Sequence, residues 1–341
     1  MKKIVAILLS VVSLFTVFAF SACDGDKGSV SIKYYNSAAE LMPALKNGAV
    51  AYGVLAEPAA TKLESITKDA KTWYRLDIQE LYDSKTKAYP QAVMLVKESL
   101  LNTHKNLINN IADKFAANAL WVSENVADAV NAVNSALPNP DSGTEVNPSL
   151  DAATLTSVAV ANCNIRWQSA VDAKTAVKDY LNSIIDIDKI SANPATDDLF
   201  YDGTAVGEFT ADTVKVFAPD GAPALAIAKF IFDNETFGTG KTFEYHVVAA
   251  NSIAAQVQNG TGDIVILPVN AASKLYNKNA ADPYKLVSVI THGNIYLMCS
   301  ENVTANDLKD KTIGVFNMGG VPDITFKAVL NKLGYNVEIA D

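Results

Sequence analysis

VKVFAPDGAPALAIAKFIF at residues 214–232, FEYHVVA at 243–249 and DIVILPV at 263–269 decide the fold of this chain. Each stretch opens with a short apolar, β-branched run, which is typical of a buried strand. In the first stretch, the turn residues Asp220 and Gly221 follow the strand, and Pro223 lies in the first turn of a helix, where its missing N–H costs nothing. Short strands that alternate with amphipathic helices predict parallel βαβ units.

The same alternation continues on both sides of these stretches. Further strands are predicted at 30–36, 51–58, 89–96, 284–290, 294–300 and 311–316, and a helix at 321–333 stops at Gly334. Ser37 is predicted to cap a helix that starts at residue 38. Residues 103–185 are predicted to be mainly helical, with a turn-rich interruption at 138–149, and residues 191–212 form a connector.

An internal repeat joins the two halves of the sequence. NGAVAYGVLAEPAATKL at 47–63 aligns without a gap to NGTGDIVILPVNAASKL at 259–275. Each copy contains a helix end, a glycine, a buried strand, a loop and a new helix. This pattern favours two similar lobes, each built on an open sheet. Chance similarity between two βα units is the alternative.

Composition excludes several classes of function. The 341 residues carry a net charge of -9 and no basic cluster, which argues against a nucleic-acid partner. His104, His246 and His292 are scattered, and the cysteines have no metal-site spacing, so neither a metal site nor a catalytic site is predicted. Cys163 and Cys299 are expected to be plain core cysteines, with a disulfide between them as the alternative.

The first residues predict export. Lys2 and Lys3 precede an apolar run at 4–20, which ends in FSAC at 20–23. This segment resembles a bacterial lipoprotein signal peptide at 1–23, which implies lipid attached to Cys23 and a tether at 24–29. Phe20 departs from the leucine that is usual there, and an uncleaved membrane helix is the alternative.

Six segments together resemble the nitrate/sulfonate/taurine-type substrate-binding proteins of ABC importers, a group that includes receptors for thiamine precursors. They are SAAELMPALKNGAVAYGVLAEPAATKL at 37–63, YPQAVMLVKESLL at 89–101, APDGAPALAIAK at 218–229, NGTGDIVILPVNAASKLYN at 259–277, YKLVSVITHGNIYLMC at 284–299 and DLKDKTIGVFNMGGVPDITFKAVLNKLGY at 307–335. The resemblance covers nearly the whole chain after the tether. It implies a two-lobed, type II periplasmic-binding-protein-like α/β fold, in which two crossing strands form the hinge.

The order of these segments differs from the family's order. The family normally begins with the strand that resembles 214–218, so the sequence looks circularly permuted, with the old ends joined through 202–212. Permutation costs little when chain ends lie close together at the surface. A truncated or misassembled reading frame is the alternative. The resemblance then assigns 301–341 and 30–71 to lobe 2, and 72–300 to lobe 1, with crossing strands near 73–78 and 294–299.

Ligands in open α/β sheets bind beyond the carboxyl ends of the strands, so the loops after the strands are the candidate site. These residues are Tyr35, Asn36, Ser37, Glu57, Asp220, Gly221, Ala222, Pro223, Asn251, Ser252, Pro268, Asn270, His292, Asn294, Met318, Gly319, Gly320 and Val321.

The chemistry of these residues suggests the kind of solute. Gly221, Gly319 and Gly320 could direct N–H groups at an anion, with plain tight turns as the alternative. Glu57 would instead attract a cation or a hydrogen-bond donor, or serve only to stabilise a helix end. Tyr35 and His292 could contact a planar ligand. This mixture fits a zwitterion or a heterocyclic metabolite better than nitrate.

The sequence therefore predicts a monomeric, membrane-anchored extracytoplasmic lipoprotein that captures a small polar solute, without a cofactor, and delivers it to an ABC permease. An enzyme of pyrimidine metabolism that shares the fold is one alternative. A surface receptor lipoprotein without a transport role is the other.

Overall fold

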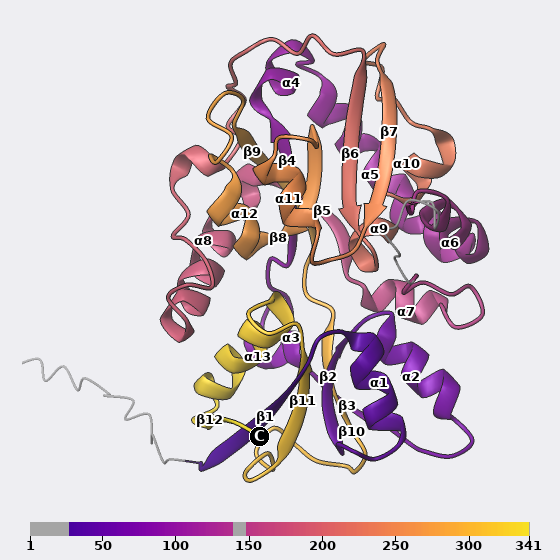
Figure 1. Cartoon of the computed structure of the whole chain (residues 1–341), viewed down its shortest axis with the longest axis vertical. Coiled ribbons are helices and arrows are strands. Elements are labelled where there is room, and N and C mark those ends of the chain that lie inside the picture. Colours follow the sequence, from indigo (N-terminus) through magenta and orange to yellow (C-terminus); the bar gives the residue numbers. More distant parts are fainter. Residues whose placement is uncertain (1–26, 139–147, 341) are drawn as a thin grey trace, which may run out of the picture.

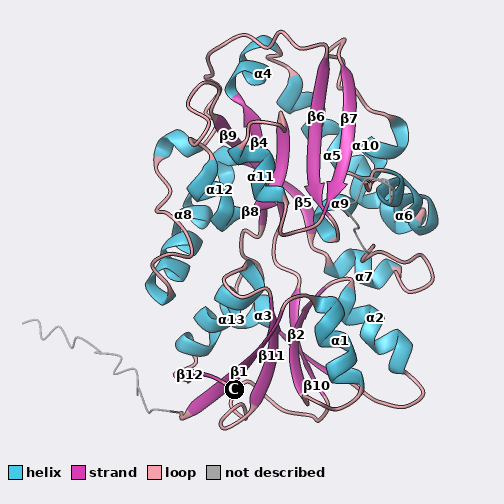
Figure 2. Cartoon of the chain, viewed as in Figure 1, coloured by secondary structure: helices cyan, strands magenta, loops and turns pink. Residues whose placement is uncertain are grey.

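The computed structural model describes residues 27–138 and 148–340. Two lobes lie one above the other, each with helices on both faces of a sheet (Figures 1 and 2). The predicted signal peptide, the predicted lipid attachment at Cys23 and residues 24–26 of the predicted tether lie outside the described residues.

The small lobe is formed by both ends of the described chain. It contains β1 (Ser29–Tyr35), α1 (Ala38–Lys46), β2 (Tyr52–Ala56), α2 (Ala59–Thr67), β3 (Tyr74–Asp77), α3 (Ile78–Tyr82), β10 (Ile295–Cys299), β11 (Thr312–Phe316), α13 (Val321–Lys332) and β12 (Asn336–Ile339). Its strands form sheet A in the order β12-β1-β11-β2-β10-β3. Only β10 runs antiparallel to its neighbours among these strands.

The large lobe is formed by the middle of the chain. It contains β4 (Ala92–Lys97), α4 (Glu98–Thr103), α5 (Leu107–Glu124), α6 (Val126–Ser135), α7 (Ser157–Asn162), β5 (Ile165–Ser169), α8 (Ala170–Ile187), the 3₁₀ turn η2 (Asp197–Leu199), β6 (Thr213–Pro219), α9 (Ala222–Leu225), α10 (Ala228–Asp233), β7 (Thr242–Val248), α11 (Ile253–Gln258), β8 (Ile264–Pro268), α12 (Val269–Leu275) and β9 (Tyr284–Thr291). Its strands form sheet B in the order β5-β9-β4-β8-β6-β7.

Five strands of each sheet share one topology. The order β7-β6-β8-β4-β9 in sheet B corresponds to β1-β11-β2-β10-β3 in sheet A, and the fourth strand of each set is antiparallel to its neighbours. The internal repeat lies on the third strand of each set, because a shift of 212 positions carries β2 onto β8. The predicted pair of similar lobes is therefore confirmed.

The chain crosses between the lobes in two adjacent segments, 83–91 and 292–294. The amide of Tyr89 donates to the carbonyl of His292 over 3.3 Å, and that of Gln91 donates to the carbonyl of Thr291 over 3.0 Å. The strands that were expected to cross, near 73–78 and 294–299, instead lie within sheet A as β3 and β10. The small lobe therefore extends to α3, beyond the boundary expected at residue 71.

Gly293 lets the two crossing segments lie this close together. Its φ is +84°, and an added Cβ would come within 2.6 Å of both Gln79 and the Tyr89 ring. A residue with a side chain would therefore meet both a strained backbone and a steric clash.

A hydrophobic core continues from one lobe to the other behind the crossing segments. It joins buried residues of β1 and α13 in the small lobe to those of α8, α11 and α12 in the large lobe. The rings of Tyr89 and Tyr180 stack with centroids 5.3 Å apart, and Tyr82 packs edge-on against both. The hydroxyl of Tyr180, on α8, is 2.7 Å from that of Thr325, on α13. We call Tyr82, Tyr89, Tyr180 and Thr325 the tyrosine seam.

The structure corrects two predictions of local structure. Residues 165–169 lie in the segment predicted to be helical, but they form β5, which pairs antiparallel with β9 at the edge of sheet B. Residues 27–29 were assigned to a flexible tether. However, the amide of Lys27 donates to the carbonyl of Gly334, and Ser29 begins β1 beside β12.

Among residues 27–138 and 148–340, no helix has the length and apolar character needed to cross a membrane.

The circular permutation stays a prediction, and the topology offers a test. The first three strands of the sheet B set, β6, β7 and β8, are consecutive along the chain, whereas their counterparts β11, β1 and β2 are divided between its two ends. β12 lies parallel to β1 and pairs Asn336 with Ser29 and Ile339 with Ile32. A linker from 340 back to 27 must therefore retrace six residues of the strand, about 20 Å, which about eight residues can span.

We expect a chain reordered as 208–340, linker, 27–207 to fold like the natural order, because the packed contacts do not change. Its melting midpoint, measured by circular dichroism, should lie within about 5 °C of that of residues 27–341, since a change in loop closure costs about 1 kcal/mol. A reordered chain without a cooperative transition would contradict this prediction.

Candidate functional site

A cavity of about 210 Å³ lies between the lobes, where strands of both sheets end. The large lobe contributes the loops after β6, β7 and β8, and the small lobe those after β2 and β11. The crossing segments contribute Gln91 and Asn294. The described residues that line this interlobe cavity are Ala38, Ala56, Glu57, Pro58, Ala59, Gln91, Ala92, Ser149, Pro219, Asp220, Gly221, Ala222, Pro223, Ala250, Pro268, Asn294, Phe316, Asn317, Val321 and Pro322.

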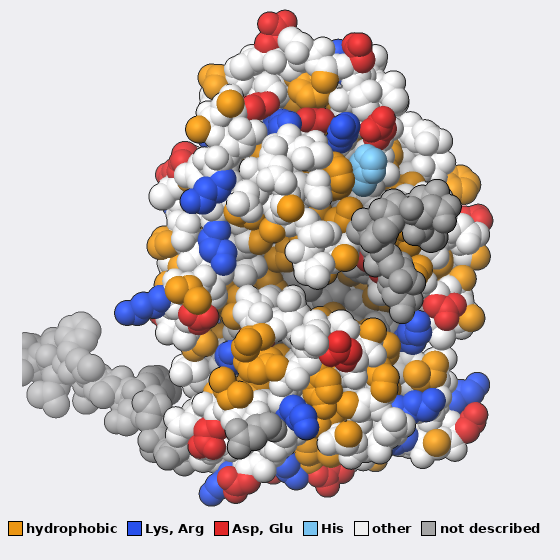
Figure 3. Space-filling view, viewed as in Figure 1, with side chains coloured by type: hydrophobic (Ala, Val, Ile, Leu, Met, Phe, Trp, Pro, Cys, Tyr) orange, Lys and Arg blue, Asp and Glu red, His pale blue; other side chains and the backbone are white. Residues whose placement is uncertain are grey.

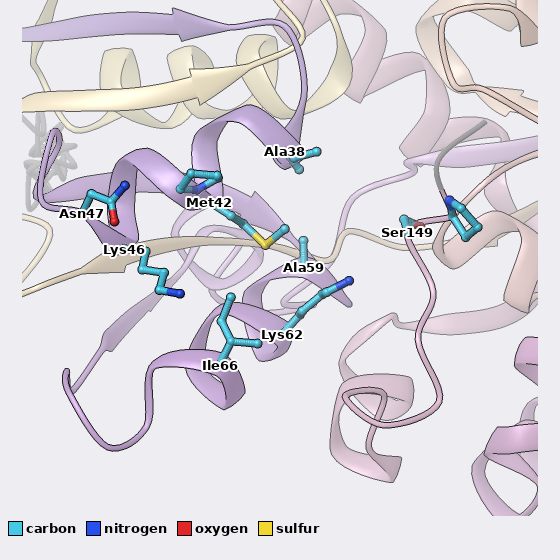
Figure 4. Close-up of a pocket in the computed structure, with 11 residues that line it drawn as sticks. Ala38, Met42, Lys46, Asn47, Ala59, Lys62, Ile66 and Ser149 are labelled. Carbon is cyan, nitrogen blue, oxygen red and sulfur yellow. The ribbon is translucent and has the colours of Figure 1, made fainter. Parts of the chain in front are cut away.

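Two further cavities adjoin it and share Ala38 and Ser149 with it. One, of about 330 Å³, is lined by Asn36, Ser37, Asn251 and Asn317, among others. The other, of about 450 Å³, lies against α1 and α2, where Lys62 extends toward the segment that carries Ser149 (Figure 4). Over the face shown in Figure 3, acidic and basic side chains are interspersed rather than gathered by sign.

Asp220 is the acidic side chain of the interlobe cavity that takes part in no ion pair among the described residues, although Lys62 acts on it electrostatically from the neighbouring cavity. One oxygen, Oδ2, accepts a hydrogen bond of 2.6 Å from the amide of Ser149. The other, Oδ1, is buried and has no partner among the described residues. Burial raises the pKa of Asp220, and the hydrogen bonds from Ser149 oppose that shift.

A chain of hydrogen bonds fixes the orientation of two amide side chains in the cavity wall. Asn294 donates through Nδ2 to the main-chain carbonyl of Glu57 over 3.1 Å. Gln91 in turn donates through Nε2 to Oδ1 of Asn294 over 2.8 Å. Oε1 of Gln91 remains, buried and without a partner among the described residues.

Glu57 lines the cavity, but its carboxylate is occupied. Oε1 lies 2.6 Å from Nη1 of Arg75, and Thr61 donates to the carboxylate through its amide and its hydroxyl, at 3.0 and 2.9 Å. Asn162, on α7 of the large lobe, lies 3.3 Å away. The side chain has no exposed surface. The expectation that Glu57 attracts a cation from the cleft is therefore corrected: its cation is Arg75.

The loop after β11 also differs from expectation. The amide of Gly319 donates to Oδ2 of Asp323, and the amide of Gly320 to the carbonyl of Asn317, both over 2.8 Å. These two N–H groups therefore have acceptors within the loop and are not free for an anion. Met318 is 66% exposed and does not line the cavity. Of the predicted residues in this loop, Val321 lines it.

Four other predicted residues have roles outside the three cavities. His292 faces Gln168, 3.0 Å away, and burial lowers its pKa to about 3, so the ring is neutral. Asn270 donates to the carbonyl of Ser191, and Ser252 to that of Ala249. Tyr35 packs against the α1 side of sheet A.

The structure adds cavity residues that were absent from the predicted set. The most informative are Gln91, Ser149 and Phe316. Gln91 could have been found from the sequence, because it precedes β4, and an antiparallel strand begins at the edge where its neighbours end. Ser149 could not have been found, because it reaches the cavity from a turn-rich loop with no strand pattern.

Cys163 and Cys299 are buried free thiols, one in the core of the large lobe and the other in the shared core. Burial raises both pKa values, that of Cys299 to about 12, so neither forms a thiolate near neutral pH. In the described part of the chain, no three His, Cys, Asp or Glu side chains group as metal ligands would.

No protein-family model and no curated protein sequence matches the chain. Among solved structures, it is similar to the crystal structure of NikA from Brucella suis in complex with Fe(III)-EDTA. The alignment has 10% identity and a TM-score of 0.26, and it covers 84% of this chain and 58% of that one. The chain therefore spans less than two thirds of the length of the structure it matches.

The strand order of the two sheets, in which the fourth strand of each set is antiparallel to its neighbours, makes this a two-lobed α/β fold of the periplasmic-binding-protein-like kind. Each lobe is an open sheet flanked by helices, and the cavity lies between the lobes at the ends of the strands.

The role given to Glu57 can be tested by stability measurements. We expect Glu57→Gln to lower the free energy of unfolding by about 1–3 kcal/mol, because Arg75 and Thr61 lose a buried ionic acceptor. Urea titration followed by fluorescence measures this loss.

Glu64→Gln is the matched control. Glu64 also pairs with Arg75, at 2.6 Å, but its side chain is 36% exposed, so the loss should be below about 1 kcal/mol. Equal losses in the two variants would show that Glu57 has no special structural role.

Proposed function

We propose that this chain is an extracytoplasmic solute-binding lipoprotein. It captures a small polar organic solute between its lobes and delivers that solute to an ABC importer. The observation that carries the proposal is the interlobe cavity, which strand-end loops of both sheets and both crossing segments build together. A site divided between two lobes that are joined by short crossings suits a receptor that closes on its ligand.

The composition of the cavity favours binding over catalysis. Its described lining includes Asp220 and Ser149 but no histidine, cysteine or lysine that could act as a partner in proton transfer or nucleophilic attack. The walls are mainly small apolar residues, with a few fixed polar atoms. This is the usual character of a site that holds a small molecule.

The division of labour along the chain is part of the proposal. Residues 1–23 direct export, and Cys23 carries the lipid. Residues 27–82 and 295–340 form the small lobe, and residues between 92 and 291 form the large lobe, which closes against it. The permease is the partner that receives the solute, and the protein acts as a monomer on the outer side of the membrane.

Binding should appear as stabilisation of the folded chain. We expect one class of small polar solute to raise the melting midpoint, because a solute at 100 times its dissociation constant stabilises the bound state by about 2.7 kcal/mol. Thermal-shift measurements over sulfonates, amino acids, amines, pyrimidines and flavins check this expectation.

The site is tested by blocking it. Ala250 is exposed and lines the interlobe cavity, so Ala250→Trp should abolish the shift without unfolding the chain. Ala70→Trp, at an exposed position outside the three cavities, should leave the shift intact. The proposal fails if no solute raises the midpoint, or if Ala250→Trp leaves the shift unchanged.

Anchoring has its own test. We expect the natural chain, expressed in a bacterium, to incorporate radiolabelled palmitate and to sediment with membranes. Cys23→Ala should incorporate no label, because the acylated thiol is gone. Label that persists in Cys23→Ala would contradict the lipidation site.

A further inference from the structure

We propose that the interlobe cavity recognises a cationic nitrogen group of its solute, a protonated amine or an amidinium, whose N–H groups donate to Oδ1 of Asp220 and Oε1 of Gln91. This inference rests on the proposed function and specifies the chemistry of its ligand.

The hydrogen-bond chain in the wall fixes Gln91 as an acceptor. The carbonyl of Glu57 can only accept, so Asn294 must turn its NH₂ group toward it. Oδ1 of Asn294 then faces Gln91, which must present its own NH₂ group. Turning Gln91 over would place two acceptors against each other. The atom left for a ligand is therefore Oε1 of Gln91, which is buried and without a partner among the described residues.

Asp220 supplies the charge. Among the described residues, Asp220 takes part in no ion pair, although its Oδ1 is buried. Lys62 is the cation that influences it electrostatically, but Lys62 lines the neighbouring cavity of about 450 Å³. A buried acceptor without a donor is costly, and a charged one more so. A ligand that brings a charged N–H donor removes that cost.

The other carboxylate of the lining does not compete for the ligand. The carboxylate of Glu57 forms an ion pair with Arg75 and accepts hydrogen bonds from Thr61, so its charge is already neutralised by the protein. The amides of Gly319 and Gly320, which could have held an anion, bond within their own loop. The two buried side-chain atoms of this lining that have no partner among the described residues are thus both acceptors, and an anion placed against them would meet the carboxylate of Asp220.

Apolar side chains line much of the cavity beside these two acceptors. Phe316, Pro223, Pro268 and Pro322 belong to its lining together with Asp220 and Gln91. The adjoining cavity of about 330 Å³ shares Asp220 and Phe316 with it, so a solute held at Asp220 has room to extend there. A cationic head with an apolar stem matches this combination.

The experiment compares matched solutes on the full chain, purified in detergent. The pairs are benzamidine with benzamide, taurine with isethionate, and arginine with citrulline, with methanesulfonate and nitrate as simple anions. We expect a thermal shift with at least one cation-bearing member and none with its partner. Isothermal titration should show that Asp220→Asn weakens that solute about tenfold or more, and Gln91→Met by a smaller factor of about threefold.

Two controls separate recognition from structure. Asp69→Asn removes an exposed carboxylate outside the three cavities and should leave affinity unchanged. Without any solute, Asp220→Asn should melt no lower than the natural chain, because an unpaired buried charge does not stabilise the fold. A lower midpoint for the solute-free variant would make Asp220 a structural residue and overturn the inference.

The remaining outcomes distinguish the two proposals. If a neutral or anionic solute binds, is excluded by Ala250→Trp and is unaffected by Asp220→Asn, the receptor function stands and the cation inference falls. If no solute of either charge raises the midpoint, both fall together.

Discussion

The architecture depends on one constraint: each time the chain crosses to the other lobe, it enters the sheet of that lobe as an antiparallel strand. β4 and β10 are the first strands after the two crossings, and each becomes the fourth member of its five-strand set. Because the crossing segments bond to each other through Tyr89, Gln91 and their partners on the return segment, the lobes meet at a fixed point. Gln91 and Asn294 sit at that point, so the same backbone geometry that joins the lobes also sets the polar atoms of the cavity.

The two acidic residues of the cavity lining differ in whether a cation neutralises them. Glu57 and Asp220 are both acidic, and both line the space between the lobes. Arg75 lies behind Glu57 and cancels its charge, whereas the surroundings of Asp220 provide the Ser149 amide on one oxygen only. The two carboxylates therefore differ in the residues behind them, and this difference leaves Asp220, rather than Glu57, able to pair with a ligand.

Much of the fold could be predicted from the sequence, because buried strands and capped helices are local patterns. The predicted strand at 214–218 lies within β6, and β8 and β11 lie within the stretches predicted at 263–269 and 311–316. The repeat at 47–63 and 259–275 maps onto equivalent strands. The edge strand at 165–169 could not be predicted, because its stability comes from pairing with β9 rather than from its own pattern. The partners of Glu57 and of the Gly319 amide were equally hidden, since side-chain pairing across the fold has no periodic trace in the sequence.

The tyrosine seam makes the contact between the lobes asymmetric. On the side of α8 and α13, the lobes share stacked rings and a continuous apolar core, and separating them there would expose that surface to water. On the side of α1, α2 and α7, the contact between the described residues includes cavities and a hydrogen bond of 3.3 Å from Asn162 to Glu57. We therefore expect the lobes to stay in contact at α8 and α13 and to separate on the side of α1, α2 and α7. Solutes would then enter and leave the cavity from that one side.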